Sequence, residues 1–308
     1  HGAVAEEIKG SREAKRRPML IEVREAGATF RSYIDGSIHT LTPERAIQVQ
    51  RQLGADIMLV LDECTPYHVD KTETARSMLL THRWAERCVA EFERSRDGSS
   101  LQALYGIVQG GVYEDLRQES ADFTCALGTF GHAVGGCLGG SKAEMQHVVG
   151  MAMASLSDDK PVHLLGIGGV QDIWSAVAKG IDTFDCVTPT RLARHGHALI
   201  RPGLGEATRG RDHLNLKNAR FRADRAPLDT ECGCYACRTF SRAYLHHLLK
   251  AGEMLAAQLL ATHNIAFMNR MLTDIRTAIR QDRYGDAMRF WLGGPAQIGR
   301  ASRRLDEG

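Results

Sequence analysis

The stretch DIMLVLDE, Asp56–Glu63, is a short apolar run that ends in two acids. Four later runs repeat this pattern of an apolar segment closed by a glycine or a polar residue: Leu104–Gln109, His132–Gly135, Val162–Gly166 and Thr183–Val187. Longer amphipathic segments separate the runs and predict helices: Thr72–Ser95, Tyr113–Leu127, Ala143–Leu156 and Val170–Lys179. Repeated β-then-α units of this kind predict a parallel sheet covered by helices.

The residues at the ends of these runs favour a barrel over an open sheet. Asp62, Gln109 and Asp185 stand at the carboxyl ends of predicted strands, where a (β/α)8 barrel carries its catalytic face. No Gly-x-Gly-x-x-Gly fingerprint follows a strand, which disfavours a dinucleotide-binding fold. We therefore expect an α/β protein with a TIM-type (β/α)8 barrel.

Two segments before the first of these strands have clear local signals. Leu41–Leu53 contains Thr42-Pro43-Glu44, which predicts a capped helix that begins near Pro43. Ala28–Leu41 alternates apolar and polar residues around Asp35-Gly36, which predicts a β-hairpin.

The composition is that of an ordinary soluble globular protein, with 43% hydrophobic and 25% charged residues in a chain of 308. No apolar run approaches the ~18 residues that a membrane span needs, so we expect no membrane association. Eight cysteines are too few for a disulfide scaffold in a chain of this length. They predict free thiols in a reducing cytoplasm.

Three of the cysteines are crowded in the run Cys232-Gly-Cys234-Tyr-Ala-Cys237. Closely spaced thiolates supply three of the four ligands of a tetrahedral zinc ion, and the residues leave His246, His247 and His263 open as the fourth. A site with four protein ligands is closed to water and therefore structural. We expect one Zn²⁺ in a subdomain that spans residues 226–308 with the C-terminal helices Tyr244–Arg280, behind a partial barrel at residues 1–225.

Two acids and one basic stretch point to a site. Residues 191–225 hold nine Arg or Lys against three acids, which fits either a solvated loop or a phosphate-facing surface. Asp62 and Asp185 could each simply cap the helix that comes next. Asp185, however, lies on an apolar strand that leads directly into Arg191 and Arg194, which fits a nucleophile that faces a phosphate-bearing substrate.

At these residues the sequence resembles the tRNA-guanine transglycosylases over almost the whole chain and in the same order. The matching stretches are LDECTPY (Leu61–Tyr67), RSM with RWAER (Arg76–Arg87), YGIVQGGVYEDLR (Tyr105–Arg117), AVGG (Ala133–Gly136), KGIDTFDCVTPTRLARHGH (Lys179–His197), PLDTECGCYACRTFSRAYLHHL (Pro227–Leu248) and THN (Thr262–Asn264). The resemblance implies a (β/α)8 barrel with an inserted zinc subdomain. It also implies exchange of guanine at the wobble position of tRNAs with a G-U-N anticodon for a 7-deazaguanine base.

The resemblance also implies a role for each matching residue. Asp185 matches the nucleophile, which forms a covalent ester with the tRNA ribose in a double displacement. The base-recognition residues correspond to Asp62, Gln109 and Gly136. Arg191 and Arg194 match the loop that contacts the neighbouring uridines. The zinc ligands match Cys232, Cys234, Cys237 and His263, so His263 is selected over the other two histidines. Family membership further implies a homodimer.

Two residues near the expected pocket point to different incoming bases. Gly139 stands where typical bacterial members carry valine, and a glycine there enlarges the pocket toward the bulkier queuine. Cys64 resembles the bacterial enzymes that use the aminomethyl precursor of that base. The sequence thus leaves queuine and the precursor open, with a slight preference for queuine.

One expected element of the family is missing from the sequence. The family's general acid/base aspartate lies in an Asp-Ser-Gly-Gly-Phe-Gln stretch, and this chain contains no such stretch. Residues 1–15 resemble the family segment directly after that stretch, so we expect about the first two barrel strands to be absent. Two alternatives therefore accompany the transglycosylase hypothesis: a catalytically inert tRNA-binding subunit or fragment, and a zinc-stabilised barrel enzyme unrelated to RNA.

Overall fold

The computed structural model describes residues 19–95, 101–201 and 212–293, which form two compact units. Unit 1 takes in the residues up to Leu165 together with Ser175–Phe184. Unit 2 takes in Gly166–Trp174 and the residues from Asp185 onward. The domain boundary expected between residues 225 and 226 stays a prediction.

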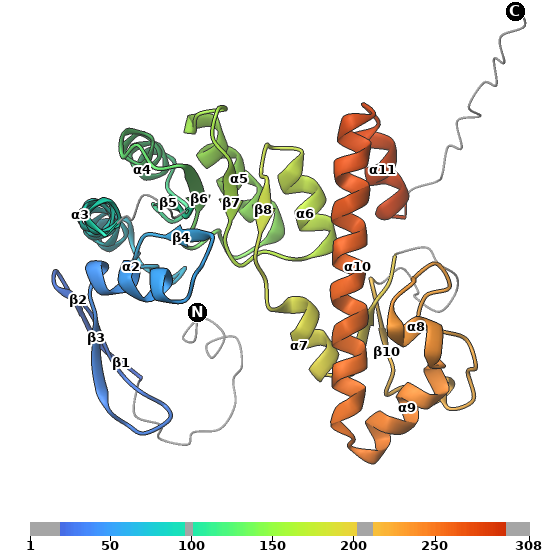
Figure 1. The fold of residues 1–308 in the computed structure, drawn as a ribbon. Coiled ribbons are helices and arrows are strands. Elements are labelled where there is room, and N and C mark those ends of the chain that lie inside the picture. Colours follow the sequence, from blue (N-terminus) through green and yellow to red (C-terminus); the bar gives the residue numbers. More distant parts are fainter. Residues whose placement is uncertain (1–18, 96–100, 202–211, 294–308) are drawn as a thin grey trace, which may run out of the picture. The chain divides into compact units, whose positions relative to one another are not determined.

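A five-stranded parallel sheet in the order β4-β5-β6-β7-β8 forms the centre of unit 1. Its strands are β4 (Ile57–Leu59), β5 (Ala103–Val108), β6 (Gly131–Val134), β7 (Val162–Leu164) and β8 (Thr183–Phe184). The helices between them are α3 (Lys71–Arg94), α4 (Glu114–Ala126), α5 (Lys142–Ser155) and α6 (Val170–Val177), as Figure 1 shows. Strands adjacent in sequence are adjacent in space, so the expected TIM-type α/β fold is confirmed by five consecutive strands.

The helices of unit 1 begin where side chains can cap them. Thr42 accepts a hydrogen bond from the Arg45 N–H at the start of α2 (Pro43–Gln52), and Asp70 does the same for Glu73 in α3. Both helices direct apolar faces to a core around Ile47, Met58 and β5. Among the described residues, no helix combines the length and the apolar composition that crossing a membrane requires.

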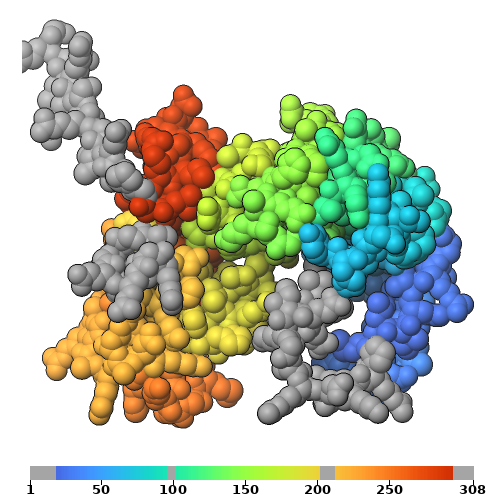
Figure 2. Space-filling model, turned by 180° about the vertical axis from the view of Figure 1, so that it is seen from behind, coloured from blue at the N-terminus to red at the C-terminus, as the bar shows by residue number. Residues whose placement is uncertain are grey.

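A small antiparallel sheet precedes the parallel one and contains the expected hairpin. It consists of β1 (Leu20–Arg24), β2 (Gly27–Arg31) and β3 (Ile38–Leu41). Gly36, in the turn between β2 and β3, has a φ of +77°, which favours glycine. The Arg87 guanidinium on α3 donates to the Glu25 carbonyl and pairs with Glu44 on α2. In both views the small sheet (blue) therefore lies beside α2 and α3 (Figures 1 and 2).

Unit 2 is built around one long helix. Its elements are α7 (Thr188–Arg194), β9 (His197–Leu199), β10 (His213–Asn215), a 3-10 helix (Ala219–Phe221), α8 (Tyr235–Thr239), α9 (Arg242–Ala251), α10 (Met254–Arg280) and α11 (Tyr284–Trp291). The helical segment expected at Tyr244–Arg280 is two helices, because Gly252 ends α9 in the left-handed conformation. The core includes Leu214, Phe221, Leu245 and Leu260.

Candidate functional site

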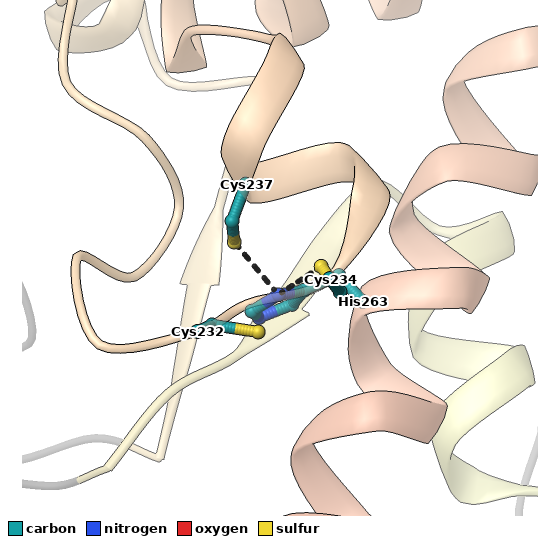
Figure 3. A group of neighbouring side chains, drawn as sticks. All are labelled: Cys232, Cys234, Cys237 and His263. Atoms are coloured by element: carbon teal, nitrogen blue, oxygen red, sulfur yellow. Dashed lines mark hydrogen bonds between the residues drawn. The ribbon is translucent and has the colours of Figure 1, made fainter.

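The three clustered cysteines and His263 come together in unit 2 (Figure 3). Cys232 and Cys234 lie before α8, Cys237 lies within it, and His263 lies on α10. One ligand atom of each lies within 4.8 Å of the others. Sulfur atoms around a tetrahedral zinc ion with bonds of about 2.3 Å stand about 3.8 Å apart. The four side chains can therefore hold a metal ion with little rearrangement.

The ring of His263 is oriented for a metal through its Nδ1 atom. Its Nε2 lies 2.8 Å from the Leu199 carbonyl oxygen, which can only accept, so Nε2 carries the proton. Nδ1 therefore presents its lone pair, 3.2 Å from the Cys237 sulfur and 3.7 Å from the Cys234 sulfur. A carbonyl that fixes the tautomer in this way is typical of metal-binding histidines.

The other two candidate histidines lie elsewhere. The Nδ1 atom of buried His246 is 2.7 Å from the Leu216 carbonyl oxygen, and His247 is exposed on α9. His263 alone of the three joins the cysteines in the described part of the chain. Spacing alone left this choice open, because ligand selection depends on how α10 packs against β9.

A buried ion pair braces the loop that carries Cys232. The Asp229 side chain is fully buried, and its carboxylate accepts from the Glu231 N–H at 2.8 Å and from the Arg270 guanidinium at 2.6 Å. Arg270 lies seven residues after His263 on α10, and therefore on the same face of that helix. One helix thus supplies both a candidate ligand and the partner of the loop that bears another. Sequence reasoning missed this pair.

A second group of candidate residues lies at the strand ends of unit 1. Asp62 follows β4, and its carboxylate accepts a hydrogen bond of 2.6 Å from the amide Nε2 of Gln109, which follows β5. The N–H of Gln109 donates to the Ser120 hydroxyl on α4, and that hydroxyl also bonds the His82 ring. The structure thus brings together two of the residues predicted for base recognition.

The environment of Asp62 favours its neutral form. Burial raises the pKa of this carboxyl to about 6, and the hydrogen bond from Gln109 opposes the rise only in part. Burial also lowers the pKa of His82 to about 4, so that ring is neutral at pH 7. The Asp62 carboxyl group consequently ionises near pH 6, and groups with such shifted pKa values concentrate at functional sites.

Gly136 lies close to the Gln109 side chain. It follows β6 with a φ of +77°, and a Cβ atom there would stand 2.4 Å from the Gln109 Oε1. Any larger residue would both strain the backbone and displace the amide. The glycine therefore lets the backbone approach the Asp62–Gln109 pair closely.

Sequence reasoning missed the residue that joins these loops, Arg117 on α4. Its side chain is fully buried and donates to main-chain carbonyls of the loops after β5 and β6. One signal could have found it, because Arg117 shares the helix spacing of the buried positions Ser120, Ala121 and Thr124. A charged residue in such a stripe needs buried partners.

The two residues expected to sense the incoming base differ in their surroundings. Cys64 is exposed on the loop after β4. Gly139 has a φ of +105°, and the direction of a side chain there is filled by Glu144, with Cγ 2.6 Å from an ideal Cβ. The Glu144 carboxylate also accepts from the Gly140 N–H at 2.8 Å. Gly139 thus makes room for Glu144.

Asp185 directly follows β8 and is exposed. One of its carboxylate oxygens accepts the N–H of Gly166 at 2.8 Å, which fixes the acid beside the end of β7. Gly166 has a φ of +74°, so the tight turn that presents this N–H favours glycine. The acid is anchored by the main chain and remains accessible to solvent.

The basic residues after Asp185 lie on a short helix that α10 holds in place. Arg191 and Arg194 are exposed on α7, which packs against α10. The Asn264 amide, buried next to His263, donates to the Pro189 carbonyl in the first turn of α7. α10 thus connects the metal-site candidate to the basic helix. Arg209 and Arg211 of the expected basic stretch lie outside the described residues.

Comparison with known proteins identifies relatives across the chain. A family model described as "Queuine tRNA-ribosyltransferase" matches residues 11–293. The curated queuine tRNA-ribosyltransferase of Roseiflexus sp. (strain RS-1) is 45% identical over 95% of this chain and 74% of its own length. Those of Synechococcus elongatus and Zymomonas mobilis are 46% and 45% identical, over 89% and 86% of this chain and 68% and 67% of their own lengths.

Proposed function

From its membership of the queuine tRNA-ribosyltransferase family, which makes the chain a tRNA-guanine transglycosylase and thus a pentosyltransferase, we propose that it exchanges guanine at the wobble position of tRNAs with a G-U-N anticodon for a 7-deazaguanine base. The observation that most directly supports this activity is the Asp62–Gln109 hydrogen bond of 2.6 Å, at strand ends and beside Gly136.

The hydrogen-bonding pattern of guanine matches this group of residues. The ring N–H and the exocyclic amine of guanine are neighbouring donors, and the Asp62 carboxylate offers two acceptor oxygens. The guanine carbonyl is an acceptor, for which the Gly136 N–H and the second hydrogen of the Gln109 amide are suitable donors. A 7-deazaguanine base keeps the two neighbouring donors and the carbonyl acceptor, so the same residues can bind the leaving base and the incoming base.

Asp185 is the nucleophile of the proposed reaction. Its carboxylate oxygen attacks the anomeric carbon of the ribose, the bond to guanine breaks, and a glycosyl ester links the tRNA to the enzyme. The incoming base then attacks the same carbon and releases the carboxylate. Two displacements on one carbon retain its configuration. The Gly166 N–H supports this role because it holds the carboxylate in a fixed position on an exposed residue.

The tRNA contacts α7 beside the nucleophile. Arg191 and Arg194 are exposed there and carry fixed positive charge toward a polyanion. Substituting either arginine weakens tRNA binding and reduces its dependence on salt.

One zinc ion is held by Cys232, Cys234, Cys237 and His263. Four protein ligands leave no open position, so the ion supplies structure and no chemistry of the reaction. The ligands join the loop before α8 to α10, and α10 in turn holds α7. The metal therefore supports the helix that binds RNA.

The decisive experiment is the Asp185→Asn variant with guanine-labelled tRNA. The proposal expects loss of both the covalent tRNA adduct and guanine release, with tRNA retained in a gel shift. An adduct that persists in Asp185→Asn contradicts the nucleophile assignment. Wild-type protein that binds tRNA but neither forms the adduct nor releases guanine is instead the inert tRNA-binding subunit.

Three further properties are expected from the same family membership and from the eight cysteines, none of which is in a disulfide: a homodimer, a cytoplasmic location and a 7-deazaguanine substrate. Light scattering after gel filtration measures the first, and fractionation of cells the second. Competition between queuine and its aminomethyl precursor identifies the preferred base. Because Glu144 fills the space beside Gly139, a Glu144→Ala variant changes that preference if this region contacts the base.

A further inference from the structure

The guanidinium of Arg117 is fully buried, and the hydrogen bonds that the described residues accept from it all end on main-chain carbonyls. Nε donates to Gly111 O at 2.8 Å, Nη1 to Val108 O at 3.1 Å and Gly135 O at 2.8 Å, and Nη2 to Cys137 O at 3.0 Å. Burial lowers the pKa of Arg117 to about 10, so the group keeps its charge at pH 7. Burying a cation costs desolvation free energy, so packing alone does not explain why an arginine occupies this position.

The four carbonyls flank the two recognition groups. Val108 and Gly111 bracket Gln109, while Gly135 and Cys137 stand on either side of Gly136. The carbonyl of Gly135 and the N–H of Gly136 belong to one peptide plane and point in opposite directions. Because Arg117 donates a hydrogen bond to that carbonyl, it fixes the direction of the Gly136 N–H.

The charge also changes the strength of this donor. A hydrogen bond from a cation is about twice as strong as a neutral one, and it polarises the peptide group that accepts it. The same peptide then donates more strongly from its N–H end. Gly136 lies close to the guanidinium, since a Cβ there would stand 3.4 Å from the Arg117 Nη2, and Gly110 lets its loop pack against the main chain of α4, where a Cβ would stand 2.7 Å from the Arg117 amide nitrogen.

We propose that Arg117 is a positioning residue for base recognition: it orients and polarises the Gly136 N–H that binds the carbonyl of guanine, and it fixes the main chain around Gln109. This inference rests on the proposed function and deepens it. Arg117 does not touch the base, and it acts through Gly136 and Gln109.

The test compares guanine with 6-thioguanine, which keeps both donors for Asp62 and replaces only the carbonyl oxygen by sulfur. Binding of each base is measured by calorimetry for wild type, Arg117→Lys and Arg117→Gln. The proposal expects the preference for guanine over 6-thioguanine to fall about fivefold in Arg117→Gln, the worth of one hydrogen bond. Arg117→Lys keeps the charge and retains part of the preference.

Trp84→Phe is the matched control. Trp84 is buried in the same unit, and the hydrogen bond that its substitution removes goes to the Glu25 carbonyl and not to the two loops. We expect Trp84→Phe to lower stability but to leave the preference for guanine over 6-thioguanine unchanged, because a loss of stability does not by itself alter that preference. If folded Arg117 variants, verified by thermal unfolding, keep the wild-type preference, the inference is overturned. A wild type that binds neither base contradicts the proposed function instead.

Hydrogen exchange in the wild type provides a second measurement that needs no variant. The inference expects the Gly135 amide, which donates to the Val108 carbonyl at 3.1 Å, to exchange slowly before any base is added, because Arg117 has already ordered this loop; the Gly136 amide, which binds the base, becomes protected only when guanine is added. Fast exchange of the Gly135 amide that slows only when guanine binds would show that the base, and not Arg117, orders the loop.

Discussion

The metal-site candidate of unit 2 and the strand-end group of unit 1 (Asp62, Gln109 and Gly136) are assembled in opposite ways. Three of the four metal ligands lie within six consecutive residues, and one helix supplies the fourth. The strand-end group instead takes its residues from three loops: the Gln109 amide bonds Asp62, and buried Arg117 bonds the main chain around Gln109 and Gly136. The comparison teaches that local spacing encodes a metal site, whereas packing between strands creates a recognition site.

Removal of the metal should have the largest effect on stability, and it should affect the metal-site region without affecting the strand-end group. We expect Cys237→Ala, or a strong chelator, to unfold the zinc subdomain, because the binding energy of a structural zinc is largely folding energy, on the order of 10 kcal/mol. Circular dichroism and zinc release report this loss. Guanine binding at the strand-end group should persist, and loss of this binding would contradict the idea that the two regions are stabilised independently.

Breaking the Asp229–Arg270 pair should have the next largest effect. Arg270→Met leaves the buried Asp229 carboxylate without its cation, which costs about 3–5 kcal/mol. Zinc affinity, measured with a chromogenic chelator, should fall roughly tenfold to a hundredfold because the loop of Cys232 loses its brace. Arg280→Met on the exposed end of α10 is the control and should leave affinity unchanged.

Lowering the pH from 7 to 5 should weaken guanine binding at the strand-end group. The raised pKa of Asp62, about 6, means that below pH 6 the carboxyl must lose a proton before it can accept two donors. We expect guanine affinity to fall about tenfold for each pH unit below 6 and to be constant above pH 7. In Asp62→Asn binding should be weak at every pH. A wild-type profile that is flat from pH 5 to 8 would contradict this role.

Two glycine variants should have the smallest effect on stability, and their difference tests the packing of the loop after β6. Gly139→Ala, at a φ of +105°, places a methyl group 2.6 Å from the Glu144 Cγ, whereas Gly180→Ala, at a φ of +98°, meets the flexible end of the Met153 side chain at 3.2 Å. Both carry the strain of the left-handed region, about 1 kcal/mol. Chemical denaturation should show a further loss for Gly139→Ala alone. Equal losses would mean that Glu144 moves aside freely.

Much of the fold follows from hydrophobic patterns that are local in sequence. Each of the five apolar runs overlaps a strand of the parallel sheet, and the predicted hairpin and capped helix form where their turn and cap residues stand. α9 and α10 were expected as one helical segment, and Gly252 divides them. The division of the chain into units depends on long-range packing, which no local pattern reports.

The sequence by itself determined the β/α units, the three clustered cysteines and the acids at the strand ends, because periodicity and short spacing act within a few residues. Only the tertiary structure placed His263 beside the cysteines, paired Asp62 with Gln109 and buried Arg117 among four carbonyls. The physical reason is the same for all three. Each contact joins segments that are distant along the chain, and the packing of α10 on β9 and the pairing of β4, β5 and β6 side by side bring these segments together.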